Sequence, residues 1–236
     1  QLTGSKIVII TASSQGYSKD RTENTKSQVI MIKEIAGKIK HYCPSAIILL
    51  VSNPLDILTY FFQKETGFPR FKVIGIASSL DTSRFRYLVS KKLSVPQSSI
   101  NNALVLGEHG DSMIPIFSGA NVDGDSLLSL VDSRDSITND LRNYWKDLRN
   151  HKSRSQFGIA KNTYDIINAI INEKEISLPA SVVLEGEYDQ NDVAMGVPVK
   201  INQNGISEIQ KIVLDEFELK QFRESSNIIK NQINSV

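Results

Sequence analysis

The sequence has almost no cysteine and no apolar run long enough to cross a membrane. Its single cysteine, Cys43, excludes an internal disulfide and fits a reducing compartment. Pro44 follows it, and we expect Cys43 to pack rather than to react. A membrane-spanning helix needs roughly 20 mostly apolar residues, and no such run occurs; residues 1–5 form neither a signal nor a transit peptide. These absences predict a cytoplasmic protein without a membrane partner.

The chain also lacks an excess of charge of either sign. Its 27 basic and 26 acidic residues leave a formal net charge of +1, and the two kinds are interspersed. This balance gives no reason to expect nucleic acid or a membrane surface as a partner. With 236 residues, 40% of them hydrophobic, the chain can bury a substantial core in one large domain or two modest ones. We expect no metal site.

Strands alternate with helices in the first half of the chain. Residues 6–12, 46–51 and 72–77 are apolar, rich in β-branched side chains and typical of strands buried on both faces of a parallel sheet. Residues 13–24 are polar and are predicted as a loop, whereas helical patterns follow this loop and the second and third strands. This order implies right-handed crossovers and a parallel sheet, in which binding sites form at the carboxyl ends of the strands.

The second half of the chain mixes helices with antiparallel strands. Residues 177–187 and 193–201 are predicted as antiparallel strands, and a strong turn follows them. A boundary near residue 118 would separate a parallel half-sheet, residues 1–118, from a mixed α+β domain, residues 119–236. The helices expected in this half cover residues 126–150, residues 155–173 and the end of the chain from about Glu216.

The stretch Leu104–Ser112 is the strongest candidate for a chemical role. Three apolar residues lead to Gly107. His109 then follows Glu108 and precedes Gly110 and Asp111. Histidine suits a proton that must move in both directions near neutral pH. Asp81 is the candidate partner for its ring, and Arg84, at the i+3 position, would share a helix face with Asp81 and could bind a carboxylate bidentately. These residues suggest a site for a small carboxylate whose oxygen gains or loses a proton.

Each of these residues has a structural alternative. An isolated histidine is more often a hydrogen-bonded structural residue. Asp81 could cap a helix and Arg84 could pair with it, and Asn53, which precedes a proline, could shape a turn. The occurrence of His109 between glycines and acids, together with Asp81 and Arg84, favours the functional interpretation.

Three motifs resemble the L-lactate/L-malate dehydrogenase family in their order and spacing. They are Val51–Pro54, Leu80–Arg86 and Gly107–Ser112, and residues 184–205 resemble the family's C-terminal sheet. The resemblance covers nearly the whole chain. It implies a Rossmann-type α/β fold and an NAD-dependent oxidoreductase that transfers a hydride between NAD(H) and a small 2-hydroxy or 2-oxo acid, either L-lactate/pyruvate or L-malate/oxaloacetate. It also implies a homodimer or a homotetramer.

The resemblance implies that the catalytic residues are His109, Asp81 and Arg21. His109 would give a proton to the carbonyl oxygen as hydride arrives and would remove the hydroxyl proton in the reverse direction, while Asp81 would orient its ring. Arg21 would polarise the reacting carbonyl. Arg84 would hold the substrate carboxylate, and Asn53 would donate to the substrate oxygen and lie beside the nicotinamide amide.

The remaining assignments from the resemblance concern the substrate pocket and the cofactor. Ser155 matches a hydroxyl-bearing position of the substrate pocket. Gln15 lies near the position that selects the substrate, where an arginine binds a second carboxylate and a neutral residue admits pyruvate or lactate. Gln15 therefore favours lactate, whereas Lys19 could supply a charge and leaves malate open. The residues that would contact NAD are Thr11, Ala12, Ser13, Val51, Asn53 and Ile159.

The family's glycine fingerprint does not occur in this sequence. Gly-x-Gly-x-x-Gly is absent, and so is the acidic residue that would bind the adenosine ribose. Both would lie upstream, and we expect only the second half of the Rossmann sheet in this chain. One interpretation is a missing amino-terminal segment of an active enzyme, which the retention of His109, Asp81, Arg84 and Arg21 favours. The other is a truncated, non-catalytic relative that acts as a carboxylate-binding or assembly module.

Overall fold

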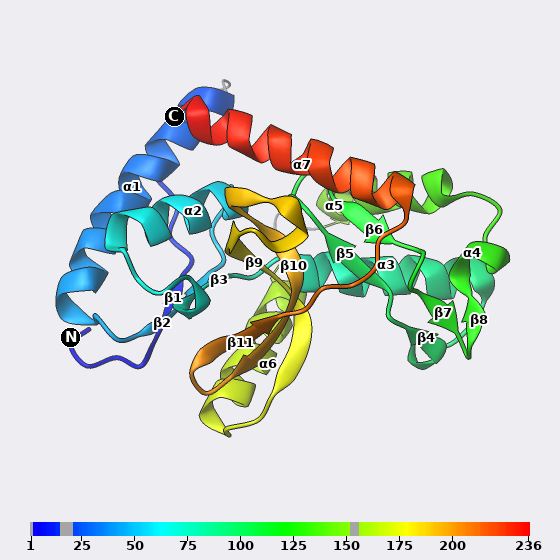
Figure 1. The fold of residues 1–236 in the computed structure, drawn as a ribbon, viewed down its shortest axis with the longest axis horizontal. Helices are drawn as coiled ribbons and strands as arrows, with labels where there is room; N and C mark the ends of the chain where they lie inside the picture. Colours follow the sequence, from blue (N-terminus) through cyan, green and yellow to red (C-terminus); the bar gives the residue numbers. More distant parts are fainter. Residues whose placement is uncertain (1, 15–20, 152–155) are drawn as a thin grey trace.

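The computed structural model describes residues 2–14, 21–151 and 156–236 of the chain. Helices pack around a six-stranded mixed sheet with the strand order β1-β2-β3-β9-β10-β11, and two small sheets, β4-β7-β8 and β5-β6, lie toward one end of the molecule (Figure 1). The structure thus has the predicted α/β class.

The bounds of the elements are as follows. The strands are β1 (Ile7–Ile10), β2 (Ile47–Leu50), β3 (Val73–Gly75), β4 (Ile100–Asn101), β5 (Leu104–Leu106), β6 (Ile114–Ile116), β7 (Asn121–Val122), β8 (Asp125–Ser126), β9 (Ile176–Glu185), β10 (Asn191–Asn202) and β11 (Gly205–Ile209). The α-helices are α1 (Arg21–Tyr42), α2 (Leu55–Thr66), α3 (Ser78–Leu93), α4 (Leu127–Leu130), α5 (Arg134–His151), α6 (Phe157–Ile171) and α7 (Glu216–Asn234).

The first three strands form the predicted parallel part of the sheet, with β1 paired to β2 and β2 to β3. Burial of β1 on both faces was a wrong prediction, because 46% of Ile9 is exposed on this edge strand. The predicted loop over residues 13–24 was also too long, since α1 begins at Arg21. The first turn of α1 contains no apolar residue, and hydrophobic periodicity therefore did not reveal it.

The parallel strands continue directly into the antiparallel ones. Strand β3 pairs with β9 at Gly75 and Ser181, and β10 is antiparallel to both of its neighbours, β9 and β11. The antiparallel strands of this half were predicted. The division into residues 1–118 and 119–236 stays a prediction. Residues 126–150 are largely helical, as predicted, but in two helices: α4 ends at Leu130, and α5 starts where the Ser133 hydroxyl accepts a hydrogen bond from the amide of Asp135.

Helix α7 begins at Glu216, as predicted, and contacts α2, β6 and β10 as it crosses the molecule (Figure 1). Asp215 and Glu218 form a capping box at its start. The buried carboxylate of Glu218 also accepts hydrogen bonds from the amides of Phe117 and Ser118. These contacts fix the start of α7 against the segment that leaves β6.

Two apolar clusters meet at strand β5. Leu106 belongs to the large cluster around the six-stranded sheet, whereas Val105 belongs to a second cluster with Phe85, Phe117 and Leu141. Because successive side chains of a strand point to opposite faces, β5 is held from both sides. Cys43 is buried in the first cluster, as expected for a packing residue. No helix in the described part of the chain is long and apolar enough to cross a membrane.

A glycine pair anchors the end of β5 to β10. The amide and carbonyl of Gly107 exchange hydrogen bonds of 2.9 Å with the carbonyl and amide of Gly196. Gly107 has a φ of +84°, which side-chain-bearing residues rarely adopt. A Cβ at Gly196 would lie 2.2 Å from Oγ of Ser78 and 3.0 Å from the Gly107 carbonyl oxygen. Only glycine allows the two backbones to approach this closely.

We expect the substitution Gly196→Ala to destabilise the protein by about 1–3 kcal/mol, because its methyl group would force β10 away from Gly107. Urea denaturation followed by circular dichroism measures the loss. Gly119→Ala is the matched control, since no atom lies within 4 Å of a Cβ built there. Equal stabilities for the two variants would contradict the account of the glycine pair.

Candidate active site

The structure brings His109, Asp81 and Arg84 together. Nδ1 of His109 lies 2.6 Å from Oδ2 of Asp81, and a guanidinium nitrogen of Arg84 donates to Oδ1 of the same carboxylate at 2.9 Å. Asp81 is only 1% exposed, whereas 19% of the His109 side chain is exposed. The sequence predicted this triplet. The imidazole is therefore fixed through Nδ1, and Nε2 is the ring nitrogen that can serve a substrate.

Hydrogen bonds between elements hold the triplet in place. Asp81 and Arg84 lie in the first two turns of α3, and the hydroxyl of Thr82 accepts a hydrogen bond of 2.8 Å from the amide of Val105 in β5. The strand that leads to His109 is thus tied to the helix that carries its partner. Ser225 of α7 accepts a hydrogen bond from the amide of Glu108, which fixes the next part of the loop.

The pKa of the His109 imidazole is raised above its ordinary value near 6.5. Burial by itself lowers this pKa, and the Arg84 guanidinium lowers it too. The charge and the hydrogen bond of Asp81, with a further contribution from the charge of Asp56, outweigh both effects. The site therefore favours a protonated histidine at pH values where a free imidazole would be neutral.

Asp56 is the polar residue of this region that the sequence reasoning missed. It lies in the first turn of α2 and is 3% exposed. Its Oδ2 accepts a hydrogen bond of 2.7 Å from the amide of His109, and its Oδ1 accepts one of 2.6 Å from the hydroxyl of Ser181 in β9. The available signal was a single acid inside an apolar helical run directly after the motif Val51–Pro54.

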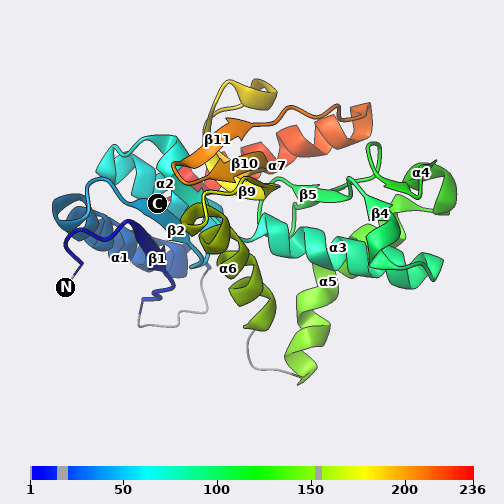
Figure 2. The same ribbon diagram turned by 90° about the horizontal axis from the view of Figure 1, so that it is seen from below.

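Several predicted cofactor residues line one apolar pocket of about 320 Å³. Thr11 and Val51 follow β1 and β2, and Ile159 comes from the first turn of α6. A Cβ at Gly158 would lie 2.7 Å from Cδ1 of Leu80, so this end of α6 touches the helix turn that carries Asp81 (Figure 2). The lining suits a flat, largely apolar ring. It consists of Ile9, Thr11, Val51, Ile159, Ala160, Thr163, Tyr164 and Ile167.

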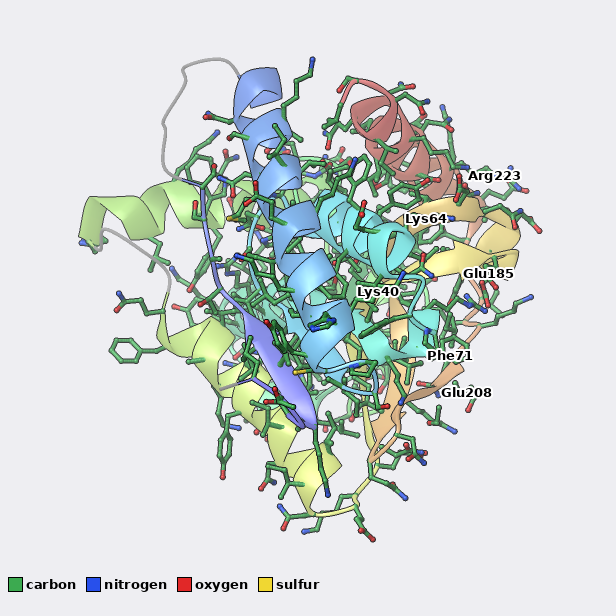
Figure 3. The ribbon with its side chains drawn as sticks, turned by 90° about the vertical axis from the view of Figure 1, so that its left-hand side faces the viewer. Lys40, Lys64, Phe71, Glu185, Glu208 and Arg223 are labelled. Atoms are coloured by element: carbon green, nitrogen blue, oxygen red, sulfur yellow. The ribbon has the colours of Figure 1, made fainter. Side chains whose placement is uncertain are left out.

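The other predicted residues at this edge follow β1 and β2, on the side seen in Figure 3, where β1 lies between α1 and α6. The hydroxyl of Ser52 donates to the carbonyl of Ala12 at 2.6 Å and joins the two strand ends. Asn53, the next residue, is exposed. The hydroxyl of Ser13 accepts a hydrogen bond from Gln28 of α1. Ala12, Ser13 and Asn53 thus lie at the carboxyl ends of the first two strands, as predicted.

Some predicted residues lie outside what the structure describes. Gln15, Lys19 and Ser155 are not among the described residues, and Arg21 is described only as the first residue of α1, without its side chain. Their assignments stay predictions. His41 is exposed at the end of α1, and His151 is exposed at the end of α5.

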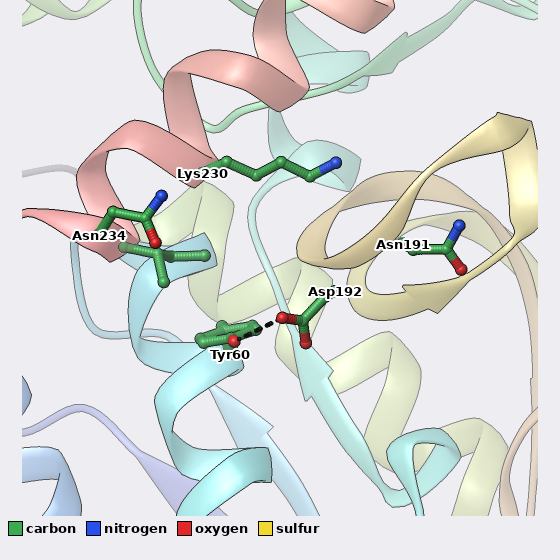
Figure 4. Close-up of a pocket in the computed structure, with 6 residues that line it drawn as sticks. Tyr60, Asn191, Asp192, Lys230 and Asn234 are labelled. Atoms are coloured by element: carbon green, nitrogen blue, oxygen red, sulfur yellow. Dashed lines mark hydrogen bonds between the residues drawn. The ribbon is translucent and has the colours of Figure 1, made fainter.

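A second, more polar hollow of about 160 Å³ lies between α2, α7 and the start of β10 (Figure 4). The hydroxyl of Tyr60 donates to Asp192 at 3.1 Å, and Lys64 pairs with the same carboxylate at 2.6 Å. No predicted site residue lines this hollow. Among the residues that the structure describes, no group of three or more histidines, cysteines or acids is arranged to hold a metal ion.

Comparisons with known proteins identify the family. A family model described as the NAD binding domain of lactate/malate dehydrogenase matches residues 1–75, and one described as the α/β C-terminal domain of lactate/malate dehydrogenase matches residues 78–236. The chain is 34% identical to a malate dehydrogenase of Chlorobium limicola, covering 98% of this chain and 76% of that protein. It is 35% identical to an L-lactate dehydrogenase of Acetivibrio thermocellus, covering 99% of this chain and 76% of that protein.

Solved structures give the same result. The malate dehydrogenase of Aeropyrum pernix has a TM-score of 0.92 and 32% identity, over 99% of this chain and 77% of that one. A lactate dehydrogenase of Cryptosporidium parvum, solved with lactic acid and NAD, has a TM-score of 0.91 and 33% identity, over 99% of this chain and 76% of that one.

We expect Asp81→Asn to lower the pKa of the His109 ring, because the amide removes the charge that outweighs burial. Titration of the ring by NMR measures the change, with the signals of His41 and His151 as internal references. The His109 signal is assigned from its loss in the His109→Asn variant. An unchanged or higher His109 pKa would contradict this account of the site.

Proposed function

The chain belongs to the lactate/malate dehydrogenase family, and from that premise we propose that His109 and Arg84 carry its chemistry, as proton donor and carboxylate binder. The protein is an NAD-dependent oxidoreductase that interconverts a 2-hydroxy acid and a 2-oxo acid. One observation carries the residue assignment: a single buried carboxylate, that of Asp81, holds both His109 and Arg84.

His109 moves the proton. Because Nδ1 is bound to Asp81, Nε2 donates its proton to the carbonyl oxygen of the 2-oxo acid during reduction and accepts the hydroxyl proton during oxidation. Asp81 keeps the ring in this orientation and stabilises its charged form, and this is why a buried carboxylate is suited to the position. The raised pKa of His109 favours the protonated donor at pH values where a free imidazole would be neutral.

Two arginines bind the acid in this proposal. Arg84 has one guanidinium nitrogen on Asp81, and its planar group can present other N–H donors to the substrate carboxylate. Arg21 polarises the reacting carbonyl; a positioned cation at a developing oxyanion can be worth roughly 3–4 kcal/mol. Asn53 donates to the same oxygen, and Ser155 contributes a hydroxyl to the substrate pocket.

The apolar pocket is our candidate for the nicotinamide site. Thr11, Val51 and Ile159 line it, and the packing of Gly158, the neighbour of Ile159, against Leu80 of α3 supports this assignment. When bound, NAD supplies or accepts the hydride. In this proposal Ala12, Ser13 and Asn53 border the cofactor from the ends of β1 and β2.

Substrate choice rests on the segment before α1. We infer that Gln15 favours pyruvate and lactate, since a neutral side chain offers no partner for a second carboxylate. Lys19 is the competing candidate, because its ammonium could pair with the second carboxylate of oxaloacetate or malate. Relatives with both names match this chain at similar identity.

Assembly into a homodimer or homotetramer is also part of the proposal. Apolar side chains on two helices support it: Ile30 of α1 and, on α6, Phe157, Tyr164 and Ile171 are exposed by 60% or more. Exposed apolar surface of this kind is typical of subunit contacts. We further propose the division into residues 1–118 and 119–236, and a cytoplasmic location.

We expect the purified protein, with its residues checked by intact mass, to oxidise NADH when pyruvate or oxaloacetate is added. His109→Asn should lower kcat by about 10²–10⁴-fold, because the proton donor is lost, while binding of the acid is kept. His41→Asn removes an exposed histidine and should leave kcat unchanged.

Two results would contradict this proposal, and they have different meanings. If the wild type binds the 2-oxo acid without oxidising NADH, the chain is a carboxylate-binding or assembly module rather than an enzyme. If His109→Asn loses affinity for the acid but keeps its turnover, His109 binds substrate and does not transfer the proton.

The substitution Gln15→Arg tests the assignment of substrate choice. It should raise the ratio of kcat/KM for oxaloacetate to that for pyruvate at least about tenfold, since the guanidinium can pair with the second carboxylate. Lys19→Gln is the comparison variant. If Lys19→Gln changes this ratio and Gln15→Arg does not, the selecting residue is Lys19.

A further inference from the structure

The guanidinium of Arg84 lies over an aromatic ring that comes from another helix. Its central carbon is 5.5 Å from the centroid of the Tyr144 ring, within the range of a cation–π contact. Arg84 belongs to α3 and Tyr144 to α5, and the two helices pack against each other (Figure 2). The side chain of Arg84 is only 12% exposed. Because cation–π contacts are strongest where water is excluded, this contact can hold the guanidinium firmly.

The packing of α5 brings Tyr144 to this position. Ile137, Leu141 and Tyr144 follow one another at spacings of four and three residues, so they share one face of the helix. Ile137 and Leu141 are buried in the second apolar cluster together with Phe85, the neighbour of Arg84 in α3. The apolar face that fixes α5 on α3 therefore carries Tyr144 to the turn that holds Arg84.

Further contacts hold the Tyr144 ring and its helix. Tyr87 lies three residues after Arg84 in α3, and its ring meets that of Tyr144 edge to face, with the centroids 6.2 Å apart. Arg142 of α5 donates a hydrogen bond of 2.9 Å to the carbonyl of Met113, just before β6. These contacts leave the ring of Tyr144 little freedom to move away from Arg84.

Two contacts of different kinds thus restrain the Arg84 guanidinium. Asp81 accepts a hydrogen bond of 2.9 Å from one terminal nitrogen, and the group lies over the ring of Tyr144. A guanidinium that is held at one nitrogen alone can still turn about that hydrogen bond. The ring of Tyr144 limits this rotation, and the donors that are not bound to Asp81 keep one direction. A planar fork binds a carboxylate bidentately only when its direction is fixed.

We propose that Tyr144 is a positioning residue for substrate binding, whose ring holds the guanidinium of Arg84 in the orientation that receives the carboxylate of the 2-oxo acid. The inference rests on the proposed function of Arg84 as the carboxylate binder. It adds a residue of the second half of the chain that acts on the substrate through Arg84.

Three substitutions separate the ring of Tyr144 from its bulk. Tyr144→Phe keeps the ring, and both contacts described above involve the ring. Tyr144→Leu keeps an apolar side chain for packing on α3 but removes the aromatic face. Tyr42→Leu is the matched control, since Tyr42 is 47% exposed at the end of α1 and its ring contacts His41.

The experiment measures kcat and KM for pyruvate or oxaloacetate, whichever the wild type reduces faster. Arg84 binds the carboxylate equally before and in the transition state, so a misdirected guanidinium raises KM more than it lowers kcat. We expect Tyr144→Leu to raise KM about fivefold or more, with kcat within about twofold of the wild type. Tyr144→Phe should stay within about twofold in both parameters, and Tyr42→Leu should follow the wild type.

A second comparison tests whether Tyr144 acts through Arg84. Arg84→Gln removes the cation that the ring holds, so Tyr144→Leu should change kcat/KM by less than about twofold in that background. An equal loss from Tyr144→Leu in both backgrounds would overturn the proposal.

Three kinetic results would also contradict the proposal. They are a wild-type KM in a folded Tyr144→Leu, a loss of kcat at unchanged KM in this variant, and a loss in Tyr144→Phe as large as that in Tyr144→Leu. If Tyr144→Leu does not fold, Tyr144→Met decides, because its flexible apolar side chain fills the space without a ring.

One NMR measurement does not depend on turnover. The Nε–H signal of Arg84, assigned from its loss in Arg84→Gln, reports on the ring directly, because an aromatic ring shifts the resonances of nearby protons. We expect this signal to move in Tyr144→Leu, to stay close to its wild-type position in Tyr144→Phe and to be unchanged in Tyr42→Leu. A signal that does not move in Tyr144→Leu overturns the contact itself. An inactive wild type would overturn the dehydrogenase assignment, while this measurement would still decide whether Tyr144 holds Arg84.

Discussion

The site depends on one buried carboxylate that is shared by a histidine and an arginine. Asp81 is 1% exposed. One of its oxygens is bound to the imidazole of His109, and the other is bound to the guanidinium of Arg84. A buried carboxylate is costly unless hydrogen bonds and opposite charges compensate it. The compensation here comes from His109 and Arg84, the two groups that we propose as the proton donor and the anion binder for a 2-oxo acid. The same interaction that makes the burial of Asp81 tolerable therefore sets the distance between them.

The rest of the fold holds this triplet from several directions. Strand β5 packs between two apolar clusters, Thr82 ties it to α3, and the glycine pair ties its end to β10. Because β3 pairs with β9, the parallel and antiparallel strands form one sheet, and Asp56 and Ser181 can meet across it behind His109. The loop that carries His109 is short, but contacts with α2, α3, α7 and β10 fix its position.

The sequence was sufficient for the parts of the site that carry distinctive chemistry. His109, Asp81 and Arg84 stand in unusual local contexts, and the strand and helix patterns put Thr11 and Val51 at neighbouring strand ends. Asp56 was missed because its role lies in contacts with residues 53 and 125 positions away in the chain, which no local pattern reveals. Three other features were missed for a related reason, because hydrophobic periodicity does not reveal helix caps or sheet edges. They are the polar first turn of α1, the break between α4 and α5, and the exposure of Ile9.

The most direct test of the account is the pH dependence of 2-oxo acid reduction by the wild-type protein, compared with the pKa of the His109 ring measured by NMR in the same buffer with NADH bound. We predict that kcat/KM falls with rising pH along one limb, and that the pKa of this limb equals that of the ring and lies above the ordinary value near 6.5. A reduction rate that is independent of pH, or that rises as His109 loses its proton, would contradict the assignment of His109 as the proton donor.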